Sequence, residues 1–418
     1  MRPSPRRGEL AMVELGLVAP QLVQPTWAEH VTAPAVDAVG PEQLTALAQR
    51  EPWSFLHVTG IDAAGPPGDD AAAHLQRLRA AGAFAAMPRP GVVVYRIGAS
   101  VQAPLGVVGD LDLADCAAGR LRRHEHTDSA KVATLEHQRA KLGVDTTPIS
   151  VAYRDPGGLQ ERLAQLTATA PAVSATTADG ARHDLWPVTD PAALDEITDL
   201  FAALEAVYVL DGHHRLAAAV RHADAVAADS GAPGDAGRIL TALFPAEQVQ
   251  LLDYRRVVRR PPHESAHALL DAVAQRFTVT PVDGPQQAEP GRRGEMGLRL
   301  DGQWYRLHPR AHICPQRLPN RLDEAVVQRH LLHDVLGAGP GCDESALSHV
   351  PGTVPLSELD ARLAPHDIVL ALHALPMAEL QAVADAGAVL PPKSTYVTPK
   401  VAAGLLLQRR TARVPAVL

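Results

Sequence analysis

The 418-residue sequence has few aromatic side chains and few cysteines. Phe, Trp and Tyr together make up 4% of the residues, so the core must consist mainly of Leu, Val, Ile and Ala. The cysteines Cys116, Cys314 and Cys342 are far apart in the sequence and form no C-x-x-C pair. This spacing argues against a disulfide framework and against a cysteine-based zinc site, and a reducing cytoplasm is the expected compartment.

Long apolar runs and an excess of basic residues are also absent. No run approaches the roughly 18 apolar residues of a membrane-spanning helix. Glu9 and Glu14 interrupt the apolar stretch after the basic N-terminus, which makes it a poor signal peptide. The 39 basic and 47 acidic residues give a net charge of −8, which argues against broad binding to nucleic acid or anionic membranes. An apolar content of 46% is ordinary for a globular protein and excludes a disordered chain.

The length is about twice what one hydrophobic core usually serves, so two domains or one large elaborated fold are expected. We expect a flexible arm over residues 1–12, an α/β core over 13–260 and a further α+β region over 261–418. Helices are predicted at 41–49, 71–81, 190–203, 216–228 and 264–277 and after residue 128, strands at 53–59, 91–97, 105–111, 149–153, 206–210 and 239–244, and a hairpin at 296–307. Residues 60–70 and 281–294, rich in Gly and Pro, are predicted to be loops.

The clearest local unit is a buried strand, a glycine turn and an alanine-rich helix. Asp211-Gly212-His213-His214-Arg215 follows the strand at 206–210. A glycine turn into a helix directs backbone N–H groups outward at the positive end of the helix dipole. Histidine and arginine donors suit phosphate oxygens, so we predict an anion site at this strand end. Asp211 could also orient a histidine or hold a magnesium ion. The alternative is that Asp211 caps the helix and Arg215 forms a structural ion pair.

Two further clusters contain candidate residues. Arg122-Arg123-His124-Glu125-His126-Thr127 combines arginines that can bind phosphate with a carboxylate that could act as a general base. A charge run of this kind is more often a solvated face, and H-E-H is not the H-E-x-x-H of metalloproteases. Pro391-Pro392-Lys393-Ser394-Thr395-Tyr396 lacks the glycines of a P-loop, so it is either a loop that closes over a phosphate or an ordinary surface loop. His330 and His333 lack a third ligand, and we interpret them as structural.

The ordered set of motifs resembles the domain of unknown function 1015 family. The set comprises residues 122–127, Tyr-Val-Leu-Asp-Gly-His-His-Arg at 208–215, Tyr-Arg-Arg-Val-Val at 254–258, Arg-Leu-Asp at 321–323, and Pro-Pro-Lys-Ser-Thr-Tyr at 391–396 with Pro399-Lys400. The resemblance extends over about residues 14–410. It implies a ParB/sulfiredoxin-like nucleotide-binding core with an additional C-terminal α+β region that packs on it. The better understood relatives include free-serine kinases, which phosphorylate the hydroxyl of L-serine.

The resemblance also implies roles for the matched positions. Asp211 to Arg215 matches the D-G-H-x-R loop with which the serine kinases hold nucleotide phosphates, and Glu125 matches a glutamate characteristic of the family. Three positions depart from the family pattern. His126 stands where the family has arginine, Val36 stands in a Pro-x-Tyr-Asp pattern in place of tyrosine, and Arg255 replaces a histidine. These departures bear on the substrate more than on the fold.

Our leading hypothesis is a cytoplasmic phosphotransferase with an alcohol group as acceptor. It would transfer a phosphoryl group from ATP or ADP, with Mg²⁺, to free L-serine or a serine-like hydroxylated metabolite. The nucleotide-binding residues would be Gly212, His213, Arg215, Arg123 and Lys393, the catalytic residues Glu125, Asp211 and His214, and the metal ligand Asp211. In this scheme Glu125 takes the proton of the acceptor hydroxyl.

Two other functions remain open. The first is a non-catalytic nucleotide-binding switch or partner-binding module of the ParB type. The second is sulfiredoxin-like redox repair, which needs a reactive cysteine beside the phosphate loop, whereas no cysteine is near Asp211 in the sequence. A role in DNA partitioning is disfavoured by the acidic charge and by the lack of a helix-turn-helix pattern.

Overall fold

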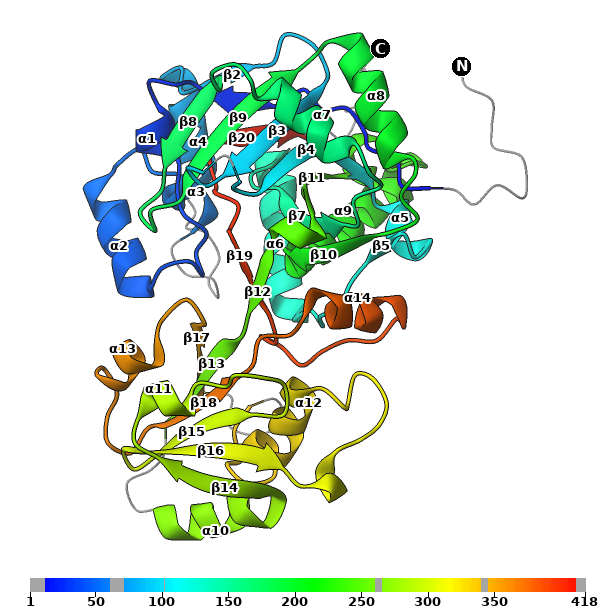
Figure 1. Ribbon diagram of the computed structural model, residues 1–418. Coiled ribbons are helices and arrows are strands. Elements are labelled where there is room, and N and C mark those ends of the chain that lie inside the picture. The colour runs from blue at the N-terminus through cyan, green and yellow to red at the C-terminus, as the bar shows by residue number, and fades with distance from the viewer. Residues whose placement is uncertain (1–11, 61–70, 101, 260–264, 340–344, 411–418) are drawn as a thin grey trace. The chain divides into compact units, whose positions relative to one another are not determined.

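The computed structural model describes residues 12–60, 71–100, 102–259, 265–339 and 345–410. Contacts between residues divide the chain into two compact units, whose elements are labelled in Figure 1. Unit 1 comprises residues 1–123, 127–249 and 399–418, and unit 2 comprises residues 124–126 and 250–398. The boundary predicted near residue 261 therefore falls inside unit 2. Cys342 and most of the predicted arm and of the loop at 60–70 lie outside the described residues.

Unit 1 is built on a mixed eight-stranded sheet with the order β5-β10-β7-β11-β4-β3-β9-β8 (Figure 1). Its strands are β3 (Val92–Ile97), β4 (Leu105–Asp112), β5 (Leu121–Arg122), β7 (Ile149–Tyr153), β8 (Val173–Thr176), β9 (Arg182–Val188), β10 (Val207–Asp211) and β11 (Arg238–Pro245). Only the pairs β5–β10 and β7–β11 are parallel among the named strands of this sheet. A four-stranded sheet has the order β2-β1-β20-β6, with β1 (Gln21–Val23), β2 (Phe84–Ala86), β6 (Val144–Asp145) and β20 (Leu406–Arg409).

The two faces of the eight-stranded sheet carry separate hydrophobic cores, because successive side chains of a strand point to opposite faces. In β3, Val92 and Val94 pack into one core, and Val93 and Tyr95 pack into the other. The helices divide in the same way. The first core includes side chains of α7 (Leu159–Leu166), α8 (Pro191–Phe201) and α9 (His213–Ser230), and the second includes α1 (Ala28–Val31), α2 (Pro41–Arg50), α3 (Leu56–Thr59) and α4 (Ala71–Ala80).

Unit 1 has two further helices, α5 (Ala114–Ala117) and α6 (Ser129–Leu142). The helix α6 begins after Asp128, whose carboxylate accepts hydrogen bonds from the backbone N–H groups of Ala130 and Lys131. The sequence predicts a helix after Thr127-Asp128, and the structure adds that the Asp128 side chain caps it. The helix α8 likewise begins after an aspartate cap, Asp190, and places a proline in its first turn.

Unit 2 contains a six-stranded sheet with the order β14-β16-β15-β18-β13-β17. Its strands are β13 (Tyr254–Val258), β14 (Phe277–Val282), β15 (Met296–Leu300), β16 (Gln303–Pro309), β17 (Leu347–Pro351) and β18 (Ile368–Leu372), and β12 (Gln250–Leu252) pairs separately with β19 (Tyr396–Thr398). The helices are α10 (Ala266–Arg276), α11 (Pro285–Ala288), α12 (Asp323–Val327), α13 (Leu356–Asp360) and α14 (Met377–Asp385), with a π-helical segment at Gln328–His333. None of the helices among the described residues is long and apolar enough to cross a bilayer.

Most predicted elements are confirmed, and two predictions are wrong. The segment predicted as a strand at 53–59 is a turn followed by α3. Phe55, Leu56 and Val58 are all buried there, which is not the alternating pattern of a half-buried strand. The predicted loop at 281–294 contains the end of β14 and the short helix α11, which begins at Pro285. Proline is favoured at the first position of a helix.

A buried charge network fixes the C-terminal segment in unit 1. The Arg410 guanidinium donates hydrogen bonds to Asp110 on β4 and to Asp145 on β6, with N–O distances of 2.7 Å. Arg139 on α6 contacts Asp145 at 3.0 Å. The side chains of Arg410, Asp110 and Asp145 are 2%, 4% and 9% exposed, so removal of one partner leaves a buried charge without compensation.

We predict that Arg410→Met lowers the free energy of unfolding by about 3–5 kcal/mol, because two buried carboxylates lose their shared cation. The exposed neighbour Arg409 provides a matched control. Arg409→Met is expected to change stability by less than about 0.5 kcal/mol. Denaturant unfolding of both variants measures the difference, and equal losses would contradict a special role for Arg410.

Candidate functional site

The predicted strand, turn and helix form as expected at the end of β10. The strand ends at Asp211, Gly212 has φ +94°, and α9 begins at His213. A side chain at position 212 would be strained by this backbone conformation, and its Cβ would lie 2.7 Å from Cγ2 of Ile149. The turn therefore requires glycine. It leaves the first backbone N–H groups of an 18-residue helix without partners inside the helix.

Asp211 is held in place by two cations. Its Oδ1 accepts a hydrogen bond from Lys400 Nζ at 3.3 Å, and its Oδ2 accepts one from Arg215 at 2.8 Å. Lys400 Nζ also donates to Asp37 Oδ2 at 2.8 Å. Burial alone raises the pKa of Asp211, but Lys400 and Arg215 outweigh burial and hold that pKa well below its usual range. Asp211 is thus a carboxylate at neutral pH, and a metal ion bound to it would replace one of these ion pairs.

Arg215 makes mainly structural contacts. One terminal nitrogen donates to the carbonyl oxygens of Thr147 and Pro148, at 3.0 and 2.8 Å, and the other donates to Asp211. The guanidinium therefore ties the turn to the segment that precedes β7. This geometry favours the structural interpretation of Arg215 left open by the sequence, and its contact with nucleotide phosphate stays a prediction.

The two histidines of the turn differ in their surroundings. His213 is only 4% exposed. The Nε2 atom of His214 accepts a hydrogen bond from the backbone N–H of Asp128 at 3.0 Å. Because Nε2 accepts, the ring carries its proton on Nδ1. His214 thereby connects the start of α9 to the start of α6.

Lys400 is the residue that sequence reasoning missed. It was part of the Pro399-Lys400 motif, but no chemical role was assigned to it. Its side chain is 5% exposed and lies between two carboxylates. A lysine close to a proline in a motif gives no indication that its partners are Asp37 and Asp211, each more than 180 residues away.

The remaining predicted site residues, Arg123, Glu125 and Lys393, lie outside the turn and α9. Arg123 is exposed in unit 1. In unit 2, Glu125 forms an isolated parallel bridge with Leu390, and the carbonyl of His124 accepts the N–H of Leu390 at 2.8 Å. His124 Nε2 lies 3.3 Å from Thr395 Oγ1. The segment with the predicted base is therefore adjacent to the 390–395 loop, which carries Lys393.

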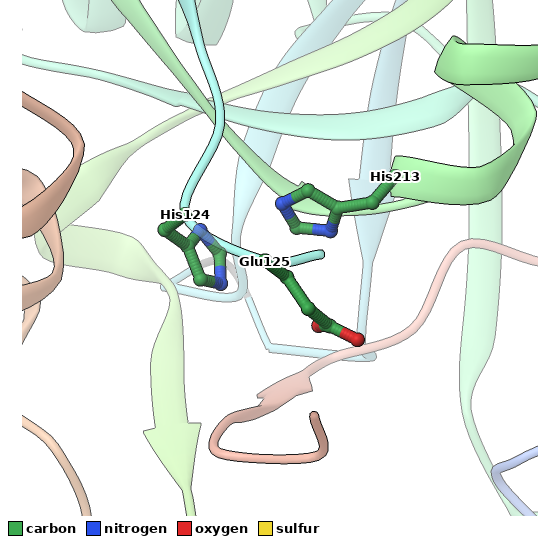
Figure 2. Close-up of side chains that lie close together, drawn as sticks. All are labelled: His124, Glu125 and His213. Atoms are coloured by element: carbon green, nitrogen blue, oxygen red, sulfur yellow. The ribbon is translucent and has the colours of Figure 1, made fainter. Parts of the chain in front are cut away.

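The residues on either side of the segment 124–126 belong to unit 1. On one side, Arg122 lies opposite Tyr208 in the β5–β10 pair, and on the other, the N–H of Asp128 contacts His214. Figure 2 shows the side chains of His124 and Glu125, which belong to unit 2, and of His213, which belongs to unit 1.

The cysteines among the described residues have the properties of unreactive thiols. Burial raises the pKa of Cys116 to about 11. Burial also raises the pKa of Cys314. Both thiols are therefore protonated at neutral pH, whereas a redox-active cysteine needs a lowered pKa. Neither of them supports sulfiredoxin-like repair.

Comparison with known proteins establishes the family. The model of the family described as "Protein of unknown function (DUF1015)" matches residues 18–331. The chain belongs to this DUF1015 family. The match confirms the resemblance that the ordered motifs indicate. No curated protein matches this DUF1015 chain.

Several solved structures are similar to this DUF1015 protein at low sequence identity. A free serine kinase variant in complex with ADP is 12% identical with a TM-score of 0.38, over 70% of this chain and 87% of that chain. SbnI with a C-terminal truncation from Staphylococcus aureus is 10% identical with a TM-score of 0.40, over 74% and 90%. A conserved hypothetical protein from Pyrococcus furiosus is 14% identical with a TM-score of 0.37, over 72% and 95%.

We predict that Lys400→Met destabilises the protein by about 1–3 kcal/mol at pH 7, allowing for the partial exposure of both carboxylates. The low pKa of Asp211 stabilises the folded state above the pKa of an unfolded aspartate, about 3.9, and this contribution is lost as the pH falls through the folded value. The penalty should therefore shrink as the pH falls below about 4.

Chemical denaturation across this pH range measures the effect of Lys400→Met. A second substitution, Asp37→Asn, removes one of the two carboxylates left without a cation and should restore part of the lost stability. A penalty that does not change with pH would contradict the charge pairing as its cause.

Proposed function

We propose that this DUF1015 protein is a small-molecule kinase on a ParB/sulfiredoxin-like core. It transfers a phosphoryl group from a nucleotide to the hydroxyl of free L-serine or a serine-like metabolite. The observation that carries this proposal is the turn at Gly212, where a buried strand leads into a long helix through a position that accepts no side chain. Such a turn lets a phosphate approach the backbone closely, and the helix dipole favours the negative charge.

In this proposal the nucleotide phosphates bind to backbone N–H groups at the start of α9. Magnesium enters with the nucleotide as part of the substrate. Asp211 forms an ion pair with Lys400 beside the turn. Because the ammonium offsets the negative charge of the carboxylate, Asp211 repels a phosphate less than an unpaired carboxylate would. Arg123 and Lys393 are the further cations that we assign to the transferred phosphoryl group.

The phosphoryl transfer then needs a base for the acceptor. Glu125 takes the proton of the hydroxyl as its oxygen attacks the terminal phosphorus, the bond between that phosphorus and the bridging oxygen breaks, and the shortened nucleotide leaves. His214 is the second candidate for proton transfer. Its Nε2 is the nitrogen that could take a proton, and it would first have to release the backbone N–H of Asp128.

We predict that Glu125→Gln lowers turnover by at least about 100-fold and leaves nucleotide affinity unchanged, because an amide cannot accept the hydroxyl proton. Phosphorus NMR with Mg–ATP or Mg–ADP and a panel of hydroxylated metabolites, L-serine first, detects the phosphomonoester product. Glu161→Gln, at an exposed position on α7, provides the control and should retain full turnover.

Three other outcomes are informative. Unchanged turnover in Glu125→Gln removes this residue as the base. Nucleotide binding without turnover in the wild-type protein favours the nucleotide-binding switch. Absence of any nucleotide binding contradicts the phosphate-binding turn.

A further inference from the structure

The backbone of Lys393 is unusual. Among the described residues, only Asp301 and Lys393 are non-glycine residues with positive φ, and Lys393 has φ +57°. The positive φ of Asp301 follows from its place in the hairpin turn, because Asp301 and Gly302 connect β15 to β16. A left-handed backbone conformation is strained for a lysine, and such conformations collect at functional sites.

The surroundings of Lys393 enforce this conformation. Buried Arg256 donates to the Lys393 carbonyl at 3.4 Å, and Ser394 Oγ donates to the carbonyl of Pro391 at 2.7 Å. Ser394 and Thr395 are 2% and 9% exposed, so the loop is anchored directly after the lysine. The strain is therefore stabilised by contacts that fix where the Lys393 side chain begins.

The Lys393 side chain lies over an aromatic ring and has no acidic partner. Its Nζ is 4.9 Å from the ring centroid of Tyr254 and 3.4 Å from the Tyr254 hydroxyl. In the part of the chain that the structure describes, no carboxylate forms an ion pair with Lys393. The ammonium is half-buried, and its charge is not neutralised locally.

His349 completes one side of this site. It lies directly opposite Arg256 in the β13–β17 pair, and its ring is 6.1 Å from that of Tyr254. Burial, followed by the charges of Arg256 and Lys393, lowers the pKa of His349 to about 3. His349 is therefore a neutral imidazole in a positive environment.

The acidic groups nearby do not cancel this positive charge. Asp253 forms an ion pair with Arg255 at 2.9 Å and accepts the backbone N–H of Leu372 at 3.0 Å. Burial raises the pKa of Glu324 to about 7, so its carboxyl group is partly protonated at neutral pH. An anion that reaches Lys393 consequently meets little repulsion.

We propose that Lys393, His349 and the Tyr254 hydroxyl bind a carboxylate, and that this is the carboxylate of an amino-acid acceptor. The proposal rests on the kinase function proposed above, and it reassigns Lys393 from the phosphoryl group to the acceptor. One ammonium with two neutral groups matches a single negative charge, whereas phosphate binding generally uses several backbone N–H groups or arginine forks. The 390–395 loop also contacts the Glu125 segment within unit 2, so the same unit contains the groups assigned to the acceptor's carboxylate and to its hydroxyl.

The test compares acceptors with and without a carboxylate. We expect Lys393→Met to raise the KM for L-serine at least tenfold and to change the KM for ethanolamine less than twofold, with the Kd of the nucleotide unchanged. Arg362→Met, which removes an exposed cation from the same unit, is the control and should alter none of these values. Equal effects on both acceptors, or a weaker affinity for the nucleotide, would overturn the assignment.

A second variant separates binding from folding. Lys393→Gly adopts φ +57° without strain, so its melting temperature should equal or exceed that of the wild type while its preference for L-serine over ethanolamine is lost. A retained preference in this variant would contradict a role for the ammonium.

Calorimetric titration with L-serine, glycolate and ethanolamine measures the binding of each compound without requiring turnover. Lys393-dependent binding of the two carboxylates to an inactive wild-type protein supports the site and refutes the kinase. Turnover without carboxylate discrimination supports the kinase and refutes the site. Absence of Lys393-dependent binding across the three compounds refutes the site as well.

Discussion

The buried ammonium of Lys400 joins three distant segments of unit 1. It contacts Asp37, near the start of the chain, and Asp211, at the end of β10, while its own segment leads into β20. A carboxylate at this position would repel the phosphate of the nucleotide that we propose as substrate, and the Lys400 ammonium beside Asp211 reduces this repulsion. Arg215 supplies the second cation and fixes the turn to residues 147–148. The Lys400 and Arg215 contacts thus connect the glycine turn to residues 147–148, to Asp37 and to the segment that leads into β20.

Because these side chains are committed to one another, the kinase that we propose would recognise phosphate through its backbone. Arg215 already binds two carbonyls and a carboxylate, and His214 accepts an N–H from the start of α6. What the turn still offers is the N–H groups at the start of α9 and a glycine with no room for a side chain. In unit 2, the Arg256 side chain likewise makes a structural contact, because it donates a hydrogen bond to the Lys393 carbonyl. The Lys393 ammonium forms no ion pair with a described carboxylate.

The sequence predicted the elements whose signals are local. The helix after Asp128, the glycine turn and the Asp301-Gly302 hairpin each depend on a few adjacent residues, and all three form. The strand prediction at 53–59 failed because a short apolar run fits a strand or a helix, and the sequence alone does not distinguish them. Lys400 could not be assigned because its partners are set by tertiary structure. The same limitation applies to Arg410, which is as polar as its exposed neighbour Arg409 and yet lies in the core.

Two positions that depart from the family motifs, Val36 and Arg255, lie beside ion pairs. Val36, which replaces the tyrosine of the family pattern, directly precedes Asp37. The ion pair between Asp37 and Lys400 forms despite this replacement. Arg255 is buried and pairs with Asp253 and Glu289. One terminal nitrogen of Arg255 donates to Asp253 and the other donates to Glu289, so the guanidinium binds both carboxylates at once. Asp253 is then unavailable to Lys393, which keeps its ammonium free to attract an anion.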